Sequence, residues 1–123
     1  MLATIVDSRI SRVHSWEYVK WTTKALLEGK KTVTRRDWNE KYAKSFYKGN
    51  VVQAYNKSSR LGGKRVAYIK LTSEPYLQWL HDVTDEDEKK EGGLWGSGKA
   101  YQEAMGNDRK VWVIEFELIK NHL

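Results

Sequence analysis

The clearest alternation of hydrophobic and polar positions lies in the run VWVIEFELI, residues 111–119. Every second residue of this run is large and apolar: Trp112, Ile114, Phe116 and Leu118. Because successive side chains of a strand point to opposite faces, the run predicts a strand with one face on a core and the other partly wet. Residues 65–72 alternate in the same way and predict a half-buried strand. Residues 2–6 and 51–55 are short β-prone segments and predict two more.

Helical spacing is strongest between residues 15 and 28. The apolar residues near helical spacing on one face are Tyr18, Trp21, Ala25 and Leu26. Ser15 suits the N-cap of this helix. Gly29 suits the position just after its C-terminus, where a left-handed backbone is common.

Shorter helices are predicted in the second half of the chain. The run TDEDEKKEGG, residues 84–93, has Thr84 as a cap and three acids in the first turn, where the helix dipole favours negative charge. A second helix is predicted over 99–105, stopped by Gly106. Residues 39–46 predict one further helical turn.

The elements together favour an α+β fold. Residues 31–36 predict a short strand, and the strands at 51–55 and 65–72 form a hairpin around a loop with Gly62 and Gly63. Short strands linked by turns, with helices inserted, are typical of a small mixed β-barrel of about five or six strands with peripheral helices. A doubly wound sheet is disfavoured because strands and helices do not alternate regularly. No linker or repeat interrupts 1–123, which predicts one domain.

Charge changes this picture, because it is unevenly distributed. The chain carries a net +6, but residues 20–70 hold 14 lysines and arginines against three acids, a net +11, so the remainder carries −5. A basic half suits a polyanion, and RNA or DNA is the obvious candidate. The alternative is a lysine-rich surface that only keeps the protein in solution.

Composition excludes several classes of function. No cysteine is present, so no disulfide or thiolate metal site exists. The histidines lack metal-ligand spacing, and the glycines lack a phosphate-binding fingerprint, so we expect no metal and no cofactor. The start of the chain is not a signal peptide, and no apolar run approaches the roughly 20 residues of a membrane span. We therefore expect a cytoplasmic protein with no membrane segment, and the sequence leaves its oligomeric state open.

One polar run points to a family. GKKTVTRRDW, residues 29–38, follows the long helix and precedes a Phe-x-Lys-Gly-Asn element at 46–50. This order resembles the ASCH domain family, relatives of the PUA RNA-binding domain. The acidic helix at 84–91 and the closing strand at 111–119 are also similar, so the resemblance covers about residues 15–119.

The resemblance implies a PUA-like β-barrel with a cleft lined by the polar run, in a family of RNA or modified-nucleoside binders. One bacterial branch hydrolyses the acetyl amide of N4-acetylcytidine, and its catalytic residues correspond here to Lys31, Thr34 and Glu91. Another member resembles a ribonuclease, so amidohydrolase, ribonuclease and non-catalytic RNA-binding module all stay open. This chain departs from the amidohydrolase branch in the insertion at 41–48 and in Arg35, which replaces an apolar residue.

The chemistry sets a geometric condition on the catalytic set. A threonine hydroxyl attacks an amide only with a base in hydrogen-bond reach, and a lysine serves as base only if its pKa falls toward neutrality. Glu91 would orient the lysine or protonate the leaving amine. In a regular strand Lys31 and Thr34 would face opposite sides, so the backbone must be irregular at 31–33. Arg36 would share the face of Thr34 and hold a phosphate or carbonyl.

Further residues are candidates for contact with the ligand: Lys30, Arg35, Arg36, Trp95 and Tyr55. The basic ones would hold a phosphate, and Trp95 would stack on a base. Each has a structural alternative. For Lys31 the alternative is a solvated strand lysine, and for Glu91 it is the exposed end of a helix. For Arg36 the alternative is a structural ion pair with Asp37 or Glu91.

Overall fold

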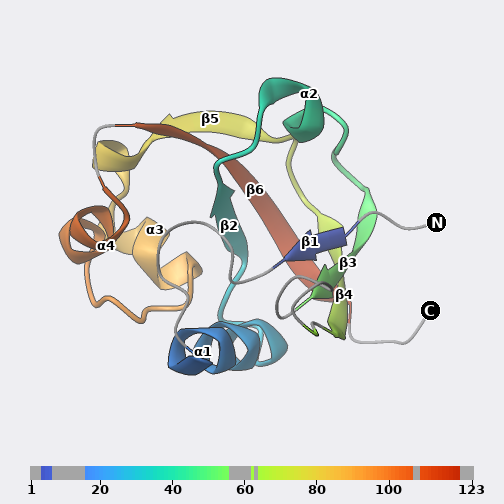
Figure 1. The fold of residues 1–123 in the computed structure, drawn as a ribbon, viewed down its shortest axis with the longest axis horizontal. Coiled ribbons are helices and arrows are strands. Elements are labelled where there is room, and N and C mark those ends of the chain that lie inside the picture. Colours follow the sequence, from blue (N-terminus) through green and yellow to red (C-terminus); the bar gives the residue numbers. More distant parts are fainter. Residues whose placement is uncertain (1–3, 7–15, 56–61, 63, 107–108, 120–123) are drawn as a thin grey trace.

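The computed structural model describes residues 4–6, 16–55, 62, 64–106 and 109–119 (Figure 1). They build a six-stranded sheet, in which five strands follow one another across the sheet. In that order they are β1 (Thr4–Val6), β3 (Val51–Tyr55), β4 (Arg65–Leu71), β6 (Lys110–Ile119) and β2 (Val33–Arg36). The sixth strand, β5 (Tyr76–Trp79), pairs with β6 outside this order. β1 runs parallel to β3, and the remaining pairs are antiparallel.

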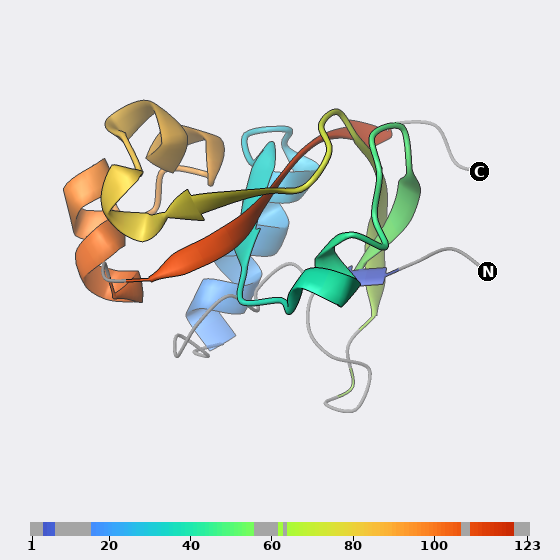
Figure 2. The same ribbon diagram turned by 90° about the horizontal axis from the view of Figure 1, so that it is seen from above.

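The long strand β6 connects the two parts of the sheet, as Figure 2 shows from above. Its first half lies between β5 and β2, and its second half pairs with β4. Of the alternating residues predicted to face a core, Trp112, Ile114 and Phe116 are buried and Leu118 is half-buried. Ile114 and Phe116 pack in the main core with six other buried apolar residues: Leu26, Phe46, Val52, Ala54, Ile69 and Leu71.

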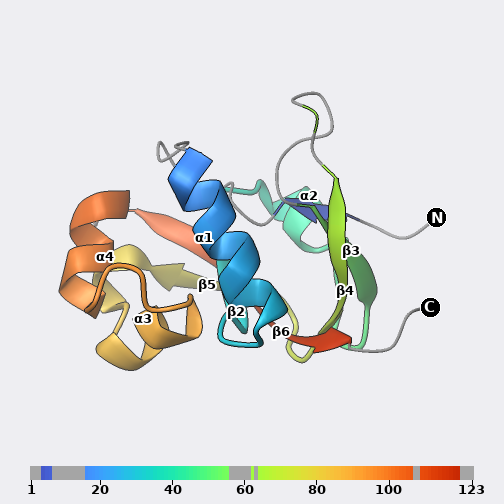
Figure 3. The same ribbon diagram turned by 90° about the horizontal axis from the view of Figure 1, so that it is seen from below.

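The helices surround this sheet at its ends and below it (Figure 3). They are α1 (Trp16–Leu27), α2 (Glu40–Ala43), the 3₁₀ turn η2 (Leu80–Asp82), α3 (Asp85–Lys90) and α4 (Gly98–Met105). α3 and α4 lie together at the end of the molecule opposite β1, β3 and β4 (Figure 1). A second, smaller core packs η2 and α4 against β6 through Leu80, Val83, Tyr101, Met105 and Val111.

The predicted α+β fold with short helices is confirmed, and among the described strands its sheet is open and does not form a closed ring. Among the described strands, β1 pairs only with β3 and β2 only with β6, so the sheet has two open edges. β1 has three residues and β2 has four, which gives each little backbone with which to close a ring. Within the described residues, no helix has the length and apolar character that crossing a membrane demands.

Most predicted elements exist with shifted ends. The strand predicted at 31–36 begins only at Val33, because the backbone N–H groups of Lys30 and Lys31 both donate to the Ala25 carbonyl and prolong the end of α1. The loop predicted around Gly62 and Gly63 lies largely outside the described residues. β5 was not predicted, because YLQW lacks alternation and only pairing with β6 makes it a strand.

Candidate functional site

The polar run reaches its position through the turn that ends α1. Gly29 adopts a positive φ of 75°, as predicted for the residue after this helix, and turns the chain back. Thr32 then donates its N–H to the Lys90 carbonyl and accepts from the N–H of Phe116. The segment before β2 is therefore tied to α1, α3 and β6 at once. The irregular backbone predicted around residues 31–33 is confirmed.

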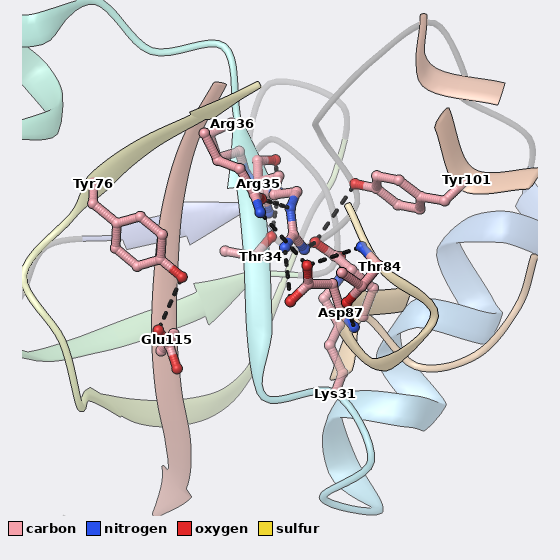
Figure 4. A network of polar contacts seen from close by, with 11 residues as sticks. Lys31, Thr34, Arg35, Arg36, Tyr76, Thr84, Asp87, Tyr101 and Glu115 are labelled. Carbon is pink, nitrogen blue, oxygen red and sulfur yellow. Dashed lines mark hydrogen bonds and ion pairs between the residues drawn. The ribbon is translucent and has the colours of Figure 1, made fainter. Parts of the chain in front are cut away.

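Glu91 is the centre of a buried ionic network. It is the C-cap of α3, and its Oε1 lies 3.1 Å from Lys31 Nζ while its Oε2 lies 2.7 Å from Arg35 Nη1. The exposed fractions are 2% for Lys31, 1% for Arg35 and 5% for Glu91. Figure 4 shows Lys31 and Arg35 as members of this network. We call these three residues the buried triad.

Further polar residues join the triad through Arg35. Arg35 Nε donates to Gln78 Oε1 on β5 at 2.9 Å, and Arg35 Nη2 lies 3.7 Å from Asp87 Oδ1. The Tyr101 hydroxyl of α4 donates to Glu91 Oε2 at 3.5 Å, and its ring lies 5.9 Å from the Arg35 guanidinium carbon. Two helices and two strands thus meet at one arginine.

The charges in this network stabilise one another. Burial on its own would raise the pKa of Glu91, but the charges and hydrogen bonds of Lys31 and Arg35 outweigh it and hold that pKa below its ordinary value. Burial likewise opposes the charge of Arg35, and Glu91 overcomes it and raises the arginine pKa. The pKa of Asp87 is also lowered, against burial, by Thr84 and Arg35. Arg35 and the carboxylates of Glu91 and Asp87 therefore remain ionised.

Thr34 and Arg36 form a separate group on the other face of β2. The Arg36 guanidinium donates to the Thr34 hydroxyl and, at 2.9 Å, to the Arg35 carbonyl. Thr34 pairs with Ile114, whose side chain belongs to the main core, so Thr34 and Arg36 face that side. The predicted shared face of Thr34 and Arg36 is confirmed. The arginine that contacts Glu91 is Arg35.

Three other candidates lie away from the buried triad. Lys30 is exposed and pairs with Glu28 at 3.4 Å. Tyr55 ends β3, which β4 and β6 separate from β2. Trp95 is half-buried and packs against the second core. A role for these residues in binding stays a prediction.

Sequence reasoning missed Gln78, Asp87 and Tyr101 as members of the network. Asp87 carried a usable signal, because it precedes Glu91 by four residues and so lies on the same side of α3. Gln78 and Tyr101 carried none, since each is distant from Arg35 in the chain and reaches it only through the fold. Among the described residues, no cluster of three histidine, aspartate or glutamate side chains has a geometry that could hold a metal ion.

The comparisons with known proteins concern the fold. No family model matches the sequence, and no curated protein matches it. The structure is similar to the crystal structure of an ASCH domain from Lactobacillus crispatus JV V101. The TM-score is 0.65 and the identity 15%, over 94% of this chain and 79% of that chain. The chain has the fold of an ASCH domain. This confirms the fold that the resemblance of the polar run implied.

A tyrosine on the same face of the sheet as Arg35 forms a separate polar pair. Tyr76 on β5 is 40% exposed, and its hydroxyl donates to Glu115 Oε2 at 2.9 Å (Figure 4). Burial and the Glu115 carboxylate raise the Tyr76 pKa to about 12, although the charge of Arg35 opposes them. The neutral phenol therefore contributes stability that is complete below pH 10, its ordinary pKa, and is lost as the pH rises toward 12.

We expect Glu115→Gln to lower the pKa of Tyr76 from about 12 toward 10, because the variant removes the negative charge that opposes the phenolate. The measurement is the ultraviolet absorbance of phenolate as a function of pH, taken as the difference from Tyr76→Phe. An unchanged late titration in Glu115→Gln would show that Glu115 does not control this phenol.

Proposed function

We propose that this protein binds RNA or a modified nucleoside and hydrolyses the N4-acyl amide of acetylcytidine. The observation that supports this most is the contact between Lys31 and Glu91, two residues 60 positions apart. Both correspond to catalytic residues of the amidohydrolase branch that the sequence resembles. Neither a solvated lysine nor an exposed helix end would be buried in this way.

The chemistry assigned to the pair is stabilisation of negative charge. Glu91 aligns the Lys31 ammonium, which donates a hydrogen bond to the acyl oxygen as charge develops there, in surroundings that strengthen such an interaction. Water adds to the acyl carbon and gives up a proton, the bond between the acyl carbon and N4 breaks, and the departing nitrogen takes up that proton. The products are acetate and cytidine. Because the Thr34 hydroxyl already accepts from Arg36, attack is assigned to water and Thr34 has a supporting role.

RNA remains within this proposal because of charge. The net +11 over residues 20–70 favours a polyanion near the polar run. A neutral nucleoside does not need this positive potential in order to bind. Whether the natural substrate is a nucleoside or an RNA is therefore decided by the residues that contact the ligand outside the buried triad.

The test is deacetylation of N4-acetylcytidine by purified protein, followed by chromatography. We expect Lys31→Arg to lose activity by about 100-fold or more, because it keeps the cation beside Glu91 but removes the amine. The matched control is Lys44→Arg, an exposed lysine paired with Glu40 at 2.9 Å, which should retain full activity. A thermal melt of each variant separates loss of chemistry from loss of folding.

Other outcomes would replace the proposal. Cleavage of a mixed RNA without deacetylation would identify a ribonuclease. Salt-sensitive RNA binding with neither reaction would identify a non-catalytic module. If Thr34→Val abolishes deacetylation while the protein stays folded, the nucleophile is Thr34 and not water.

A further inference from the structure

The segment between β2 and β3 presents aromatic and basic side chains together. Among the described aromatic residues, Tyr47 at 57% and Tyr42 at 44% have the largest exposed fractions. Each tyrosine has an exposed lysine next to it in the chain, Lys41 before Tyr42 and Lys48 after Tyr47. Tyr42 and Lys41 belong to α2, and Tyr47 and Lys48 belong to the turn that follows it. We call these four residues the α2 surface.

The backbone beneath Tyr42 is fixed by an aromatic cluster. Trp38 stacks on Phe46 with ring centroids 4.9 Å apart, and the Tyr42 ring packs edge-on against both, at 5.0 and 5.3 Å. Phe46 is buried in the main core, and Trp38 packs against that core. Asn39 caps α2 by accepting the Tyr42 N–H at 2.8 Å. Side chains held in place before binding lose less conformational entropy when a ligand binds.

The turn that carries Tyr47 and Lys48 is fixed in the same way. The Asn50 N–H donates to the Tyr47 carbonyl at 3.0 Å, and Gly49 supplies the positive φ of 90° that this turn requires. Gly49 also donates its N–H to the Leu71 carbonyl at 2.8 Å, and the Leu71 N–H donates to the Asn50 carbonyl at 2.9 Å. The turn is therefore bound to the end of β4, and its exposed side chains stand on an ordered support.

The α2 surface carries positive charge. Residues 39–50 hold three lysines and one acid, a net +2. The acid is Glu40, which pairs with Lys44 at 2.9 Å and so neutralises a lysine outside the α2 surface. Within the part of the chain that the structure describes, neither Lys41 nor Lys48 forms an ion pair. Both charges are thus available to an anionic partner.

Aromatic rings and cations on one ordered surface fit a single-stranded nucleic acid. Unpaired bases stack on exposed aromatic rings, and the phosphates between them attract lysines. A duplex would hide its base faces from the tyrosines. An acidic peptide would use the lysines but would give the tyrosine rings little to stack on. The net +11 over residues 20–70 has the sign that a nucleic-acid strand requires.

The α2 surface is separate from the buried triad. α2 lies on the other side of β2 from α3 and α4, whose residues Glu91 and Tyr101 meet at the triad (Figures 1 and 2). We propose that the α2 surface is a binding site for single-stranded RNA, distinct from the site of deacetylation. The choice of RNA over DNA rests on the proposed function, because the substrate proposed there is a ribonucleoside.

The test is fluorescence anisotropy with a short, unstructured, labelled RNA that contains no acetylcytidine. We expect Tyr47→Ala to weaken binding about tenfold, which is the size of the loss of one base stacked on an aromatic ring. Tyr47→Phe keeps the ring and should bind within about twofold of the unmodified protein. Lys48→Gln removes one phosphate contact, so the slope of log affinity against log salt should fall by about 0.7.

Matched controls come from the other end of the molecule. Trp79 is 40% exposed and ends β5 next to η2, far from α2 (Figure 1). Trp79→Ala removes an exposed aromatic ring there and should leave the affinity for RNA unchanged. Lys99 is an exposed lysine of α4, and Lys99→Gln should keep the salt dependence of the unmodified protein. A thermal melt of each variant confirms that it is folded.

Several results would overturn the inference. They are equal affinity in Tyr47→Ala and the unmodified protein, equal binding of an RNA duplex, tighter binding of a DNA strand of the same sequence, and no RNA binding by the folded protein. The proposed function fails by a different result. RNA binding that depends on Tyr47, in a protein that does not deacetylate N4-acetylcytidine, would overturn the proposed function and leave the α2 surface in place.

Discussion

Glu91→Gln should lower the free energy of unfolding by about 3–5 kcal/mol. The variant keeps the size of the side chain but removes the charge that Lys31 and Arg35 share. Both cations would remain buried with a neutral amide between them, and the cost of an unpaired buried charge is large. Urea unfolding followed by circular dichroism measures the difference. Because Arg35 would keep Asp87 as a partner, we expect the loss of stability to stay within this range.

An exposed ion pair supplies the control for this variant. Glu40 pairs with Lys44 on the surface of α2, so Glu40→Gln should leave stability unchanged within error. The pH dependence supplies a second check. Because the Glu91 pKa is lowered on folding, its stabilisation is complete above the ordinary value of 4.5 and is lost as the pH falls below it. Equal free energies of unfolding for Glu91→Gln and the unmodified protein at neutral pH would contradict a buried ionic triad.

Gly98→Ala should lower the free energy of unfolding by about 2–3 kcal/mol. A Cβ at this position would lie 2.5 Å from the Val83 carbonyl oxygen and 2.6 Å from the carbonyl carbon of Thr84. These are backbone atoms at the start of α3, and they cannot rotate away. Gly98 also donates its N–H to Asp85 at 2.8 Å, so a shift of α4 would break this contact. The measurement is again urea unfolding.

Gly93→Ala separates crowding from backbone strain. Gly93 has a φ of +83°, which disfavours other residues, but a Cβ there would meet no atom within 4 Å. Its variant should cost about 1 kcal/mol from strain alone. If Gly98→Ala costs no more than Gly93→Ala, the close approach of α4 to the start of α3 does not limit stability.

The predicted elements that proved accurate have local causes. Thr84 caps α3 through a reciprocal capping box with Asp87, and acids fill the first turn, as the run TDEDEKKEGG indicated. β6 forms where its alternating sequence predicted, but residues 111–114 are buried on both faces, and the second face is exposed only in part at Glu115 and from Glu117 onward. β5 was missed because it has no such pattern and depends on its neighbour in the sheet. That the sheet stays open was not predictable, because neither edge strand alone encodes which strand it pairs with.

For the candidate site, the chain by itself determined which groups were available: a lysine, two arginines and a threonine just after one helix, and a glutamate at the end of another. Their identity followed from the motif, and the shared face of Thr34 and Arg36 followed from strand geometry. Only the tertiary structure decided that Arg35 joins Lys31 on Glu91, while Thr34 and Arg36 face the main core. The physical reason is that burial of these charges requires partners, and β5, α3 and α4 bring those partners from distant parts of the chain.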